Sequence, residues 1–129
     1  MASPTQSSES FDEISHVIWN HLEERDWLDA VPRNLATSIV LEASELLEHY
    51  QWADEPVGSK QALADELADI FIYGFQFAHI NEIDIAEAIR HKLAKAAKKY
   101  PASHFKGKQG AERSKAWMEA KTKYKKDGL

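Results

Sequence analysis

Four carboxylic acids on two nearby segments form the pattern in this sequence with the clearest chemical potential. Glu42 and Glu45 are three residues apart, and Glu66 and Asp69 repeat that spacing further along the chain. Residues three apart on a helix project from one face, so each pair offers two oxygen donors in one direction. If the four carboxylates come together, the repulsion between any two charges about 4 Å apart costs on the order of 4 kcal/mol. Such a cluster is stable only when it binds protons or cations.

A divalent metal ion is the cation that these residue types favour. Ligands that are all oxygen suit Mg²⁺, with Mn²⁺ as a possible substitute. A di-iron site is disfavoured because it requires Glu-x-x-His pairs, and neither Glu42 nor Glu66 has a histidine three residues later. Paired acids also occur on exposed helix faces without any ion, and the spacing alone leaves that reading open.

The acid pairs fall on two segments that we expect to be helices. The first runs from Arg33 or Asn34 to about Trp52, and the second from about Ser59 to His79, as judged from apolar residues that recur every three or four positions. Pro56 and Gly58 indicate a loop between them. Because a short loop makes consecutive helices antiparallel neighbours, we expect the two acidic strips to face each other across a partly buried cleft.

The rest of the chain also reads as helical. Ser10 and Glu13 predict a capping box at the start of the first helix. Further helices are expected at about 9–26, 85–99 and 111–125, with a loop over 103–110. We therefore predict an all-α fold that resembles a four-helix bundle and carries an additional C-terminal helix or tail. The expected organisation is a disordered tail at 1–8, one domain at 9–105 and a basic loop and helix at 106–129.

Composition narrows the functional classes. A chain of 129 residues and 14.7 kDa suits a single domain, and its mean hydropathy of −0.52 is that of an ordinary water-soluble protein. The absence of cysteine excludes disulfides, thiol catalysis and thiolate metal sites. Neither a long apolar run nor a secretory signal is apparent. We expect a cytoplasmic protein without a membrane partner.

Charge is divided unevenly along the chain. Residues 1–89 contain 3 Lys and Arg residues against 18 Asp and Glu residues, whereas residues 90–129 contain 13 against 3. The basic stretch either folds back on the acidic part, remains solvated, or contacts phosphate groups. A nucleic-acid partner is not expected.

The acid pairs and their surroundings resemble a known family. The segments that carry the resemblance are Glu24-Arg-Asp-Trp27, Pro32-Arg-Asn-Leu35, Glu45-Leu-Leu-Glu48, Gln51-Trp52, residues 65–73 and Lys98-Lys-Tyr-Pro101. Together with the spacing of the four acids, they are similar to the MazG-like branch of the all-α nucleoside triphosphate pyrophosphohydrolases, which includes the dCTP pyrophosphatases and integron-associated MazG proteins. The resemblance covers about residues 10–105.

This resemblance implies an activity and a metal site. The activity would be hydrolysis of a nucleoside triphosphate, preferably a deoxynucleotide, to the monophosphate and pyrophosphate, as house-cleaning of the nucleotide pool. Mg²⁺ would be held by Glu42, Glu45, Glu66 and Asp69. Glu45 is the acid we assign to orient or deprotonate the attacking water.

The resemblance also implies substrate contacts. Trp27 and Trp52 would line the base pocket, and Tyr73 would pack beside the substrate. The candidates for phosphate contacts are Lys92, Lys95, Lys99 and Tyr100. Two departures leave the preferred nucleotide open: Ala96 stands where the family commonly has Asn, and Ile18 where the dCTP-specific relatives have His.

Two other functions remain compatible with the sequence. One is a non-catalytic helical interaction module, and the other is a related pyrophosphohydrolase acting on dUTP or phosphoribosyl-ATP. The assembly is also expected to exceed one chain. Because Phe71, Phe75 and Phe77 are spread around the third helix, one chain is not expected to bury every side of it, which predicts a homodimer or homotetramer.

Overall fold

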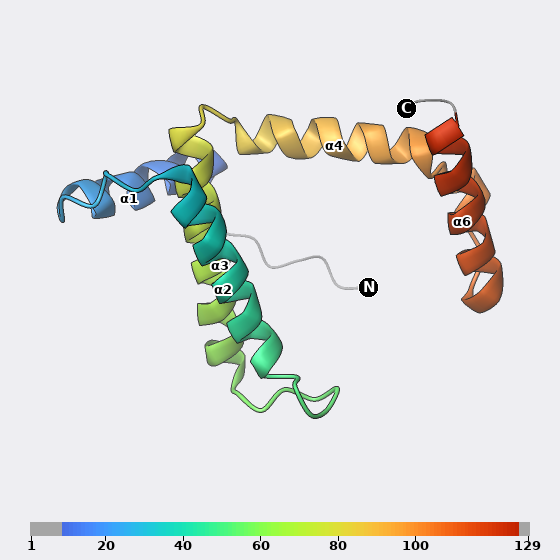
Figure 1. The fold of residues 1–129 in the computed structure, drawn as a ribbon, viewed down its shortest axis with the longest axis horizontal. Helices are drawn as coiled ribbons and strands as arrows, with labels where there is room; N and C mark the ends of the chain where they lie inside the picture. Colours follow the sequence, from blue (N-terminus) through green and yellow to red (C-terminus); the bar gives the residue numbers. More distant parts are fainter. Residues whose placement is uncertain (1–8, 127–129) are drawn as a thin grey trace. The chain divides into compact units, whose positions relative to one another are not determined.

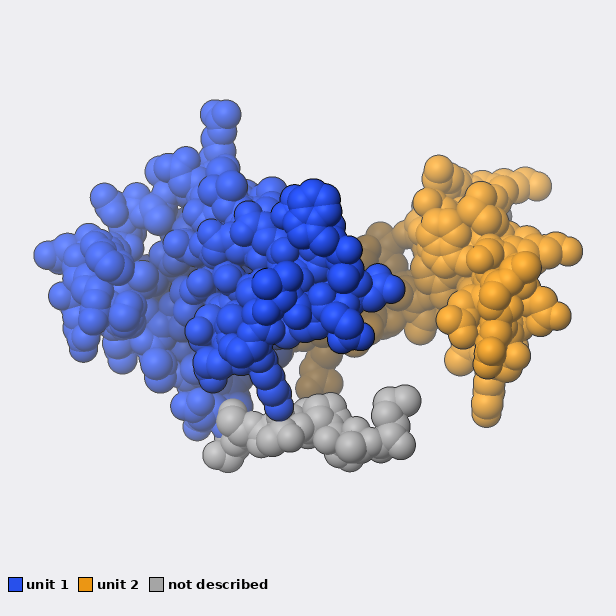
Figure 2. Space-filling view, turned by 90° about the horizontal axis from the view of Figure 1, so that it is seen from below, with its two compact units in different colours: residues 1–85 blue, residues 86–129 orange. Residues whose placement is uncertain are grey.

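The computed structural model describes residues 9–126, so the tail expected at 1–8 lies outside the described residues. Within that range the chain is helical and contains no strand, which confirms the all-α prediction. The described residues form six helices, and Figure 1 labels all of them except the short α5. The chain divides into two compact units, residues 1–85 and 86–129, which Figure 2 distinguishes by colour. We describe each unit by itself.

Helix α1 (Phe11–Glu23) begins directly after the predicted cap, Ser10, and ends three residues before the predicted bound at 26. The Ser10 side chain accepts a hydrogen bond from the Glu13 amide at 3.2 Å, and the Ser10 amide donates to the Glu13 carboxylate at 2.8 Å. This reciprocal pair satisfies two amides that the first turn of a helix leaves free. The predicted capping box is confirmed.

Helices α2 (Pro32–Glu48) and α3 (Lys60–Ile80) form the packed pair of the first unit. Pro32 starts α2 because a proline in the first turn loses no helical hydrogen bond. Ser59 caps α3 by accepting a hydrogen bond from the Ala62 amide at 3.2 Å. The two helices run side by side in opposite directions (Figure 1).

Our prediction that the second helix extends to about Trp52 is wrong. Helix α2 ends at Glu48, and the next amides bond to carbonyls only three residues back, as in Tyr50 to Leu47 at 2.9 Å. The loop then folds back to the end of α2, where the Val57 amide donates a hydrogen bond to the His49 carbonyl at 2.8 Å. The loop therefore starts earlier than the apolar pattern indicates.

Helix α1 packs against α3. The rings of Phe11 and Phe75 meet edge to face at 5.8 Å, and the rings of Trp19 and His79 lie 3.7 Å apart. The buried apolar side chains of this unit are Leu22, Leu35, Phe75 and Ala78. This core fixes the C-terminal half of α3.

The second unit contains most of α4 (Ile85–Lys99), together with α5 (Ala102–Phe105) and α6 (Gly110–Lys126). The ring of Tyr100 stacks with Trp117 at 6.5 Å and meets Phe105 edge to face at 5.7 Å. Among residues 86–126, Ala116 is the buried apolar residue. Helices α4 and α6 match the expected bounds within one residue.

The expected loop over 103–110 is partly wrong, because α5 forms at its start. Pro101 precedes this short helix, and its carbonyl accepts a hydrogen bond from the His104 amide at 3.0 Å. A turn follows, in which Gly107 adopts a φ of +82° that favours glycine. A single helical turn leaves no periodic pattern long enough to be read from sequence.

Among the described residues, no helix combines the length and apolarity needed to cross a bilayer.

Candidate functional site

Three of the predicted acids meet between α2 and α3. Glu42 and Glu45 lie on successive turns of α2, and Glu66 lies on α3. One carboxylate oxygen from each lies within 4.8 Å of the others. Glu42 and Glu66 are half-buried, whereas Glu45 is exposed. The antiparallel packing of the two helices thus brings acids 24 residues apart in sequence into one cluster.

Glu42 experiences the strongest electrostatic perturbation in this cluster. Its pKa is raised above the ordinary value of 4.5, first by desolvation and then by a side-chain hydrogen bond shared with Glu45. The charges of Glu45, Asp69 and Glu66 raise the Glu42 pKa further. All these causes disfavour the ionised carboxylate in the absence of a counter-charge.

The surroundings of Glu42 fit a hard divalent cation. Its Oε2 atom is buried and, among the described residues, has no hydrogen-bond partner. A buried oxygen without a partner is rare in proteins and requires an explanation, such as a bound ion. The surrounding donors are carboxylates, which Mg²⁺ and Mn²⁺ prefer.

Asp69 connects the acid cluster to a neighbouring cavity. Its charge acts on Glu42, although it is not one of the three acids whose oxygens lie within 4.8 Å of one another. The same residue lines a cavity of about 840 Å³ between α1, the segment after it, α2 and α3. A cavity of that volume is in the range of small-molecule sites.

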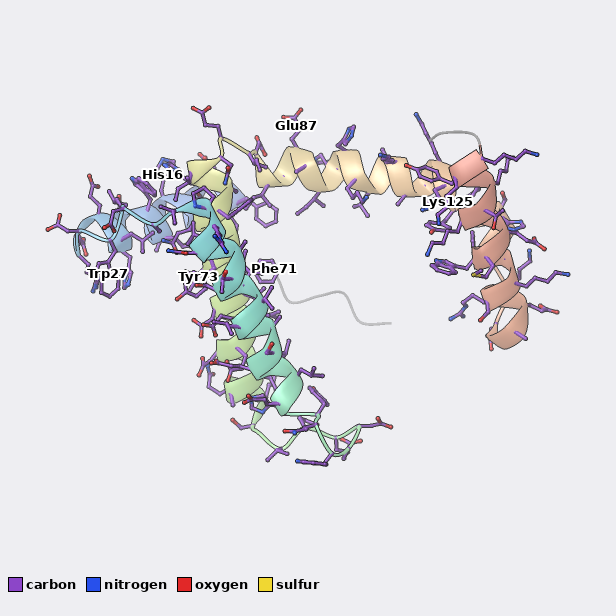
Figure 3. The ribbon with its side chains drawn as sticks, viewed as in Figure 1. His16, Trp27, Phe71, Tyr73, Glu87 and Lys125 are labelled. Atoms are coloured by element: carbon purple, nitrogen blue, oxygen red, sulfur yellow. The ribbon has the colours of Figure 1, made fainter. Side chains whose placement is uncertain are left out.

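The cavity combines apolar walls with a few polar groups. Its aromatic and polar lining residues are His21, Trp27, Asp29, Asn34, Ser38, Asp69, Phe71, Tyr73, Phe75 and Gln76. Trp27 and Tyr73, two of the predicted substrate residues, are both in this set, and Figure 3 labels them on the segment after α1 and on α3. A flat aromatic side chain here is suited to stacking on a planar ligand.

The other predicted substrate residues are not in this lining. Trp52 lies in the loop after α2 with 85% of its surface exposed. The predicted residues Lys92, Lys95, Lys99 and Tyr100 belong to the second unit. In that unit the Lys99 ammonium lies 4.2 Å from the centre of the Tyr124 ring and 5.3 Å from that of Tyr100. Their role toward a substrate stays a prediction.

Sequence reasoning missed several residues of this site. His21 and Gln76 line the cavity but belong to no motif that we singled out, and Asn34, which lies in the Pro32-Arg-Asn-Leu35 motif, was given no role. His49 contacts Glu66, with Nε2 of the imidazole 3.5 Å from Oε1 of the carboxylate. The spacing of seven residues from Glu42 places His49 on the same helical face as Glu42, but the sequence analysis assigned it no role.

Comparison with known proteins assigns the family. The sequence profile of the MazG-like family matches residues 37–113, a range that contains all four predicted acids. The chain belongs to the MazG-like family. This result confirms the resemblance drawn from the acid spacing and the flanking motifs.

Relatives of this MazG-like chain include two mammalian proteins. It is 32% identical over 110 residues to dCTP pyrophosphatase 1 of Bos taurus, an alignment that covers 78% of this chain and 65% of the relative. It is 35% identical over 88 residues to dCTP pyrophosphatase 1 of Homo sapiens, covering 61% and 52%. The matched region thus spans between about half and two thirds of these relatives.

The MazG-like fold is also similar to a solved structure. The crystal structure of a pyrophosphatase from Archaeoglobus fulgidus superposes with a TM-score of 0.63 at 29% sequence identity. The superposition covers 77% of this chain and 99% of the archaeal one. Nearly the whole archaeal chain therefore has a counterpart here.

Proposed function

We propose that this protein hydrolyses a nucleoside triphosphate, preferably a deoxynucleotide, to the monophosphate and pyrophosphate. The observation that carries the proposal is the convergence of Glu42, Glu45 and Glu66 next to Asp69, which lines the cavity. Membership in the MazG-like family and similarity to pyrophosphatases support the same reaction.

The acids provide a site for Mg²⁺, with Mn²⁺ as a substitute. Glu42, Glu45 and Glu66 would hold the ion, and Asp69 would complete the set. When bound, the cation neutralises phosphate oxygens and lowers the pKa of a water. The buried oxygen of Glu42 that has no hydrogen-bond partner supports this assignment.

Glu45 is the acid that we assign to the attacking water. It is the exposed member of the three clustered acids, so water reaches its carboxylate most readily. A carboxylate in this place orients the water and accepts its proton as the oxygen attacks the α-phosphorus. Glu42, which is half-buried, is less accessible to water and therefore a poorer candidate for that step.

The cavity would receive the base and sugar. Trp27 would stack on the base and Tyr73 would pack beside the substrate, both from the cavity lining. Trp52, which lies outside this lining, would add a second aromatic surface. The lysines at 92, 95 and 99, with Tyr100, would contact the β- and γ-phosphates. Ile18 lines this cavity at the position where the resemblance leads us to expect His in dCTP-specific relatives, so we assign no base preference.

The proposed setting is the cytoplasm, where the protein would remove nucleotides from the pool as a homodimer or homotetramer. The alternatives from the sequence are a non-catalytic helical module and a pyrophosphohydrolase for dUTP or phosphoribosyl-ATP. A panel of dCTP, dATP, dTTP, dUTP and phosphoribosyl-ATP with Mg²⁺ separates them. Pyrophosphate released together with a monophosphate supports the enzyme, whereas no release from any nucleotide supports the module.

Replacing Glu45 by Ala tests the site itself. We expect turnover to fall by about a hundredfold or more, the scale of a lost general base, while circular dichroism shows unchanged helicity. Glu48→Ala is the matched control, because Glu48 is an exposed acid on the same helix outside the cluster. Full activity of the Glu45 variant would mean that the acid cluster is not the catalytic centre.

A further inference from the structure

His49 occupies a fixed place at the end of α2. It is the C-terminal capping residue of that helix, and its carbonyl accepts the Val57 amide at 2.8 Å. Its own amide bonds back to the carbonyls of Leu46 and Leu47. The backbone of His49 is therefore held by the helix on one side and by the returning loop on the other.

Gly58 determines where the imidazole can lie. A Cβ atom added at Gly58 would overlap Cε1 and Nδ1 of His49. The loop backbone can approach the ring this closely only because residue 58 has no side chain. The ring is packed against Gly58 through Cε1 and Nδ1, and its other nitrogen, Nε2, lies 3.5 Å from Oε1 of Glu66.

The contact between His49 and Glu66 is partly shielded from water. The His49 side chain is 15% exposed and that of Glu66 is 23% exposed. An imidazole nitrogen this close to a carboxylate oxygen interacts with it more strongly there than at an open surface. A carboxylate has two oxygens, so one can meet the imidazole while the other remains available for a cation.

We propose that His49 is a positioning residue that holds the Glu66 carboxylate in the orientation needed to bind the cation. Gly58 leaves the space that the His49 ring occupies. This inference rests on the proposed metal site. Partners of this kind fix the direction of a ligating carboxylate, and their loss typically lowers metal affinity about 10- to 100-fold. His49 would act through Glu66 and would not touch the substrate.

Direct binding of Mn²⁺ to the full chain, without nucleotide, tests the proposal. Electron paramagnetic resonance of free Mn²⁺ gives the dissociation constant independently of turnover. We expect His49→Leu to weaken binding by about tenfold or more, and His49→Gln, which keeps a side-chain N–H, to restore most of the affinity. Gly58→Ala should also weaken binding, because the new methyl group displaces the ring without removing it.

His16→Leu is the matched control. His16 also pairs with an acid, Asp12 at 4.0 Å, but its side chain is 72% exposed on α1, outside the acid cluster. Its loss should leave Mn²⁺ affinity unchanged. Thermal unfolding in EDTA verifies that each variant folds.

The possible results separate the two proposals. Wild-type affinity in His49→Leu, or equal weakening in His49→Leu and His49→Gln, would overturn the positioning role and leave the metal site standing. Failure of the wild-type protein to bind Mn²⁺ would instead overturn the proposed metal site. Loss of affinity in His49→Leu with recovery in His49→Gln supports the positioning role.

Discussion

At the scale of single residues, Glu42 shows what the site requires. Its carboxylate is half-buried beside Glu45, Glu66 and Asp69, and one of its oxygens has no hydrogen-bond partner. Without a cation, a proton shared with Glu45 is the means that the folded chain offers to reduce this repulsion. Proton binding and metal binding at Glu42 therefore compete.

This competition predicts a pH dependence for the metal-free protein. Folding raises the Glu42 pKa above 4.5. Between about pH 4.5 and the raised pKa, the folded state therefore binds more protons than the unfolded state. The free energy of unfolding should then decrease as pH rises from about 4.5 through the raised pKa. Glu42→Gln cannot ionise, so its stability relative to wild type should increase over the same window.

Thermal unfolding in EDTA at a series of pH values measures this difference. Glu48→Gln is the control, because it removes an exposed carboxylate from the same helix. A stability difference between Glu42→Gln and wild type that is independent of pH would contradict the interpretation of Glu42.

At the scale of elements, the start of α3 sets the register of its acids. Ser59 fixes the first turn, and Glu66 and Asp69 follow at seven and ten residues, about two and three turns later. The core at the opposite end, around Phe75 and Ala78, fixes the helix against α1. Both ends of α3 are thus anchored while its middle carries the site.

Ser59→Ala should lower the free energy of unfolding by about 1 kcal/mol, because the Ala62 amide loses its capping acceptor. Ser44→Ala provides the contrast: Ser44 lies in the middle of α2, where its hydroxyl bonds to the Val40 carbonyl, and Ala is the better helix former there. Urea unfolding of both variants measures the difference. Equal destabilisation by the two changes would contradict the assigned cap.

At the scale of the whole molecule, the first unit exposes several large apolar side chains. The exposed fractions are 63% for Val40, 58% for Leu41, 67% for Leu47, 48% for Leu67 and 54% for Phe71. Helix α3 therefore keeps apolar side chains exposed in this unit, as we expect from its sequence. Because exposed apolar side chains often mark interaction sites, we expect contact with another chain here.

We expect the native mass in solution to be a multiple of 14.7 kDa, as a dimer or tetramer. Leu47→Glu places a charge within the exposed apolar surface of α2 and should shift the mass toward that of one chain. Light scattering after size-exclusion chromatography measures both, with Lys60→Glu as a surface-charge control. A wild-type mass of one chain would contradict the expected assembly.

The sequence alone determined the features that depend on neighbours a few residues away. Ser10 and Ser59 mark helix starts through local capping. The three-residue spacing of the acids places the two members of each pair on one face of a helix. The tertiary structure decided where α2 ends, that the close cluster consists of Glu42, Glu45 and Glu66 without Asp69, and that the His49 ring lies beside Glu66 and against Gly58. These contacts depend on the path of the 49–59 loop and on packing between helices, which local periodicity does not encode.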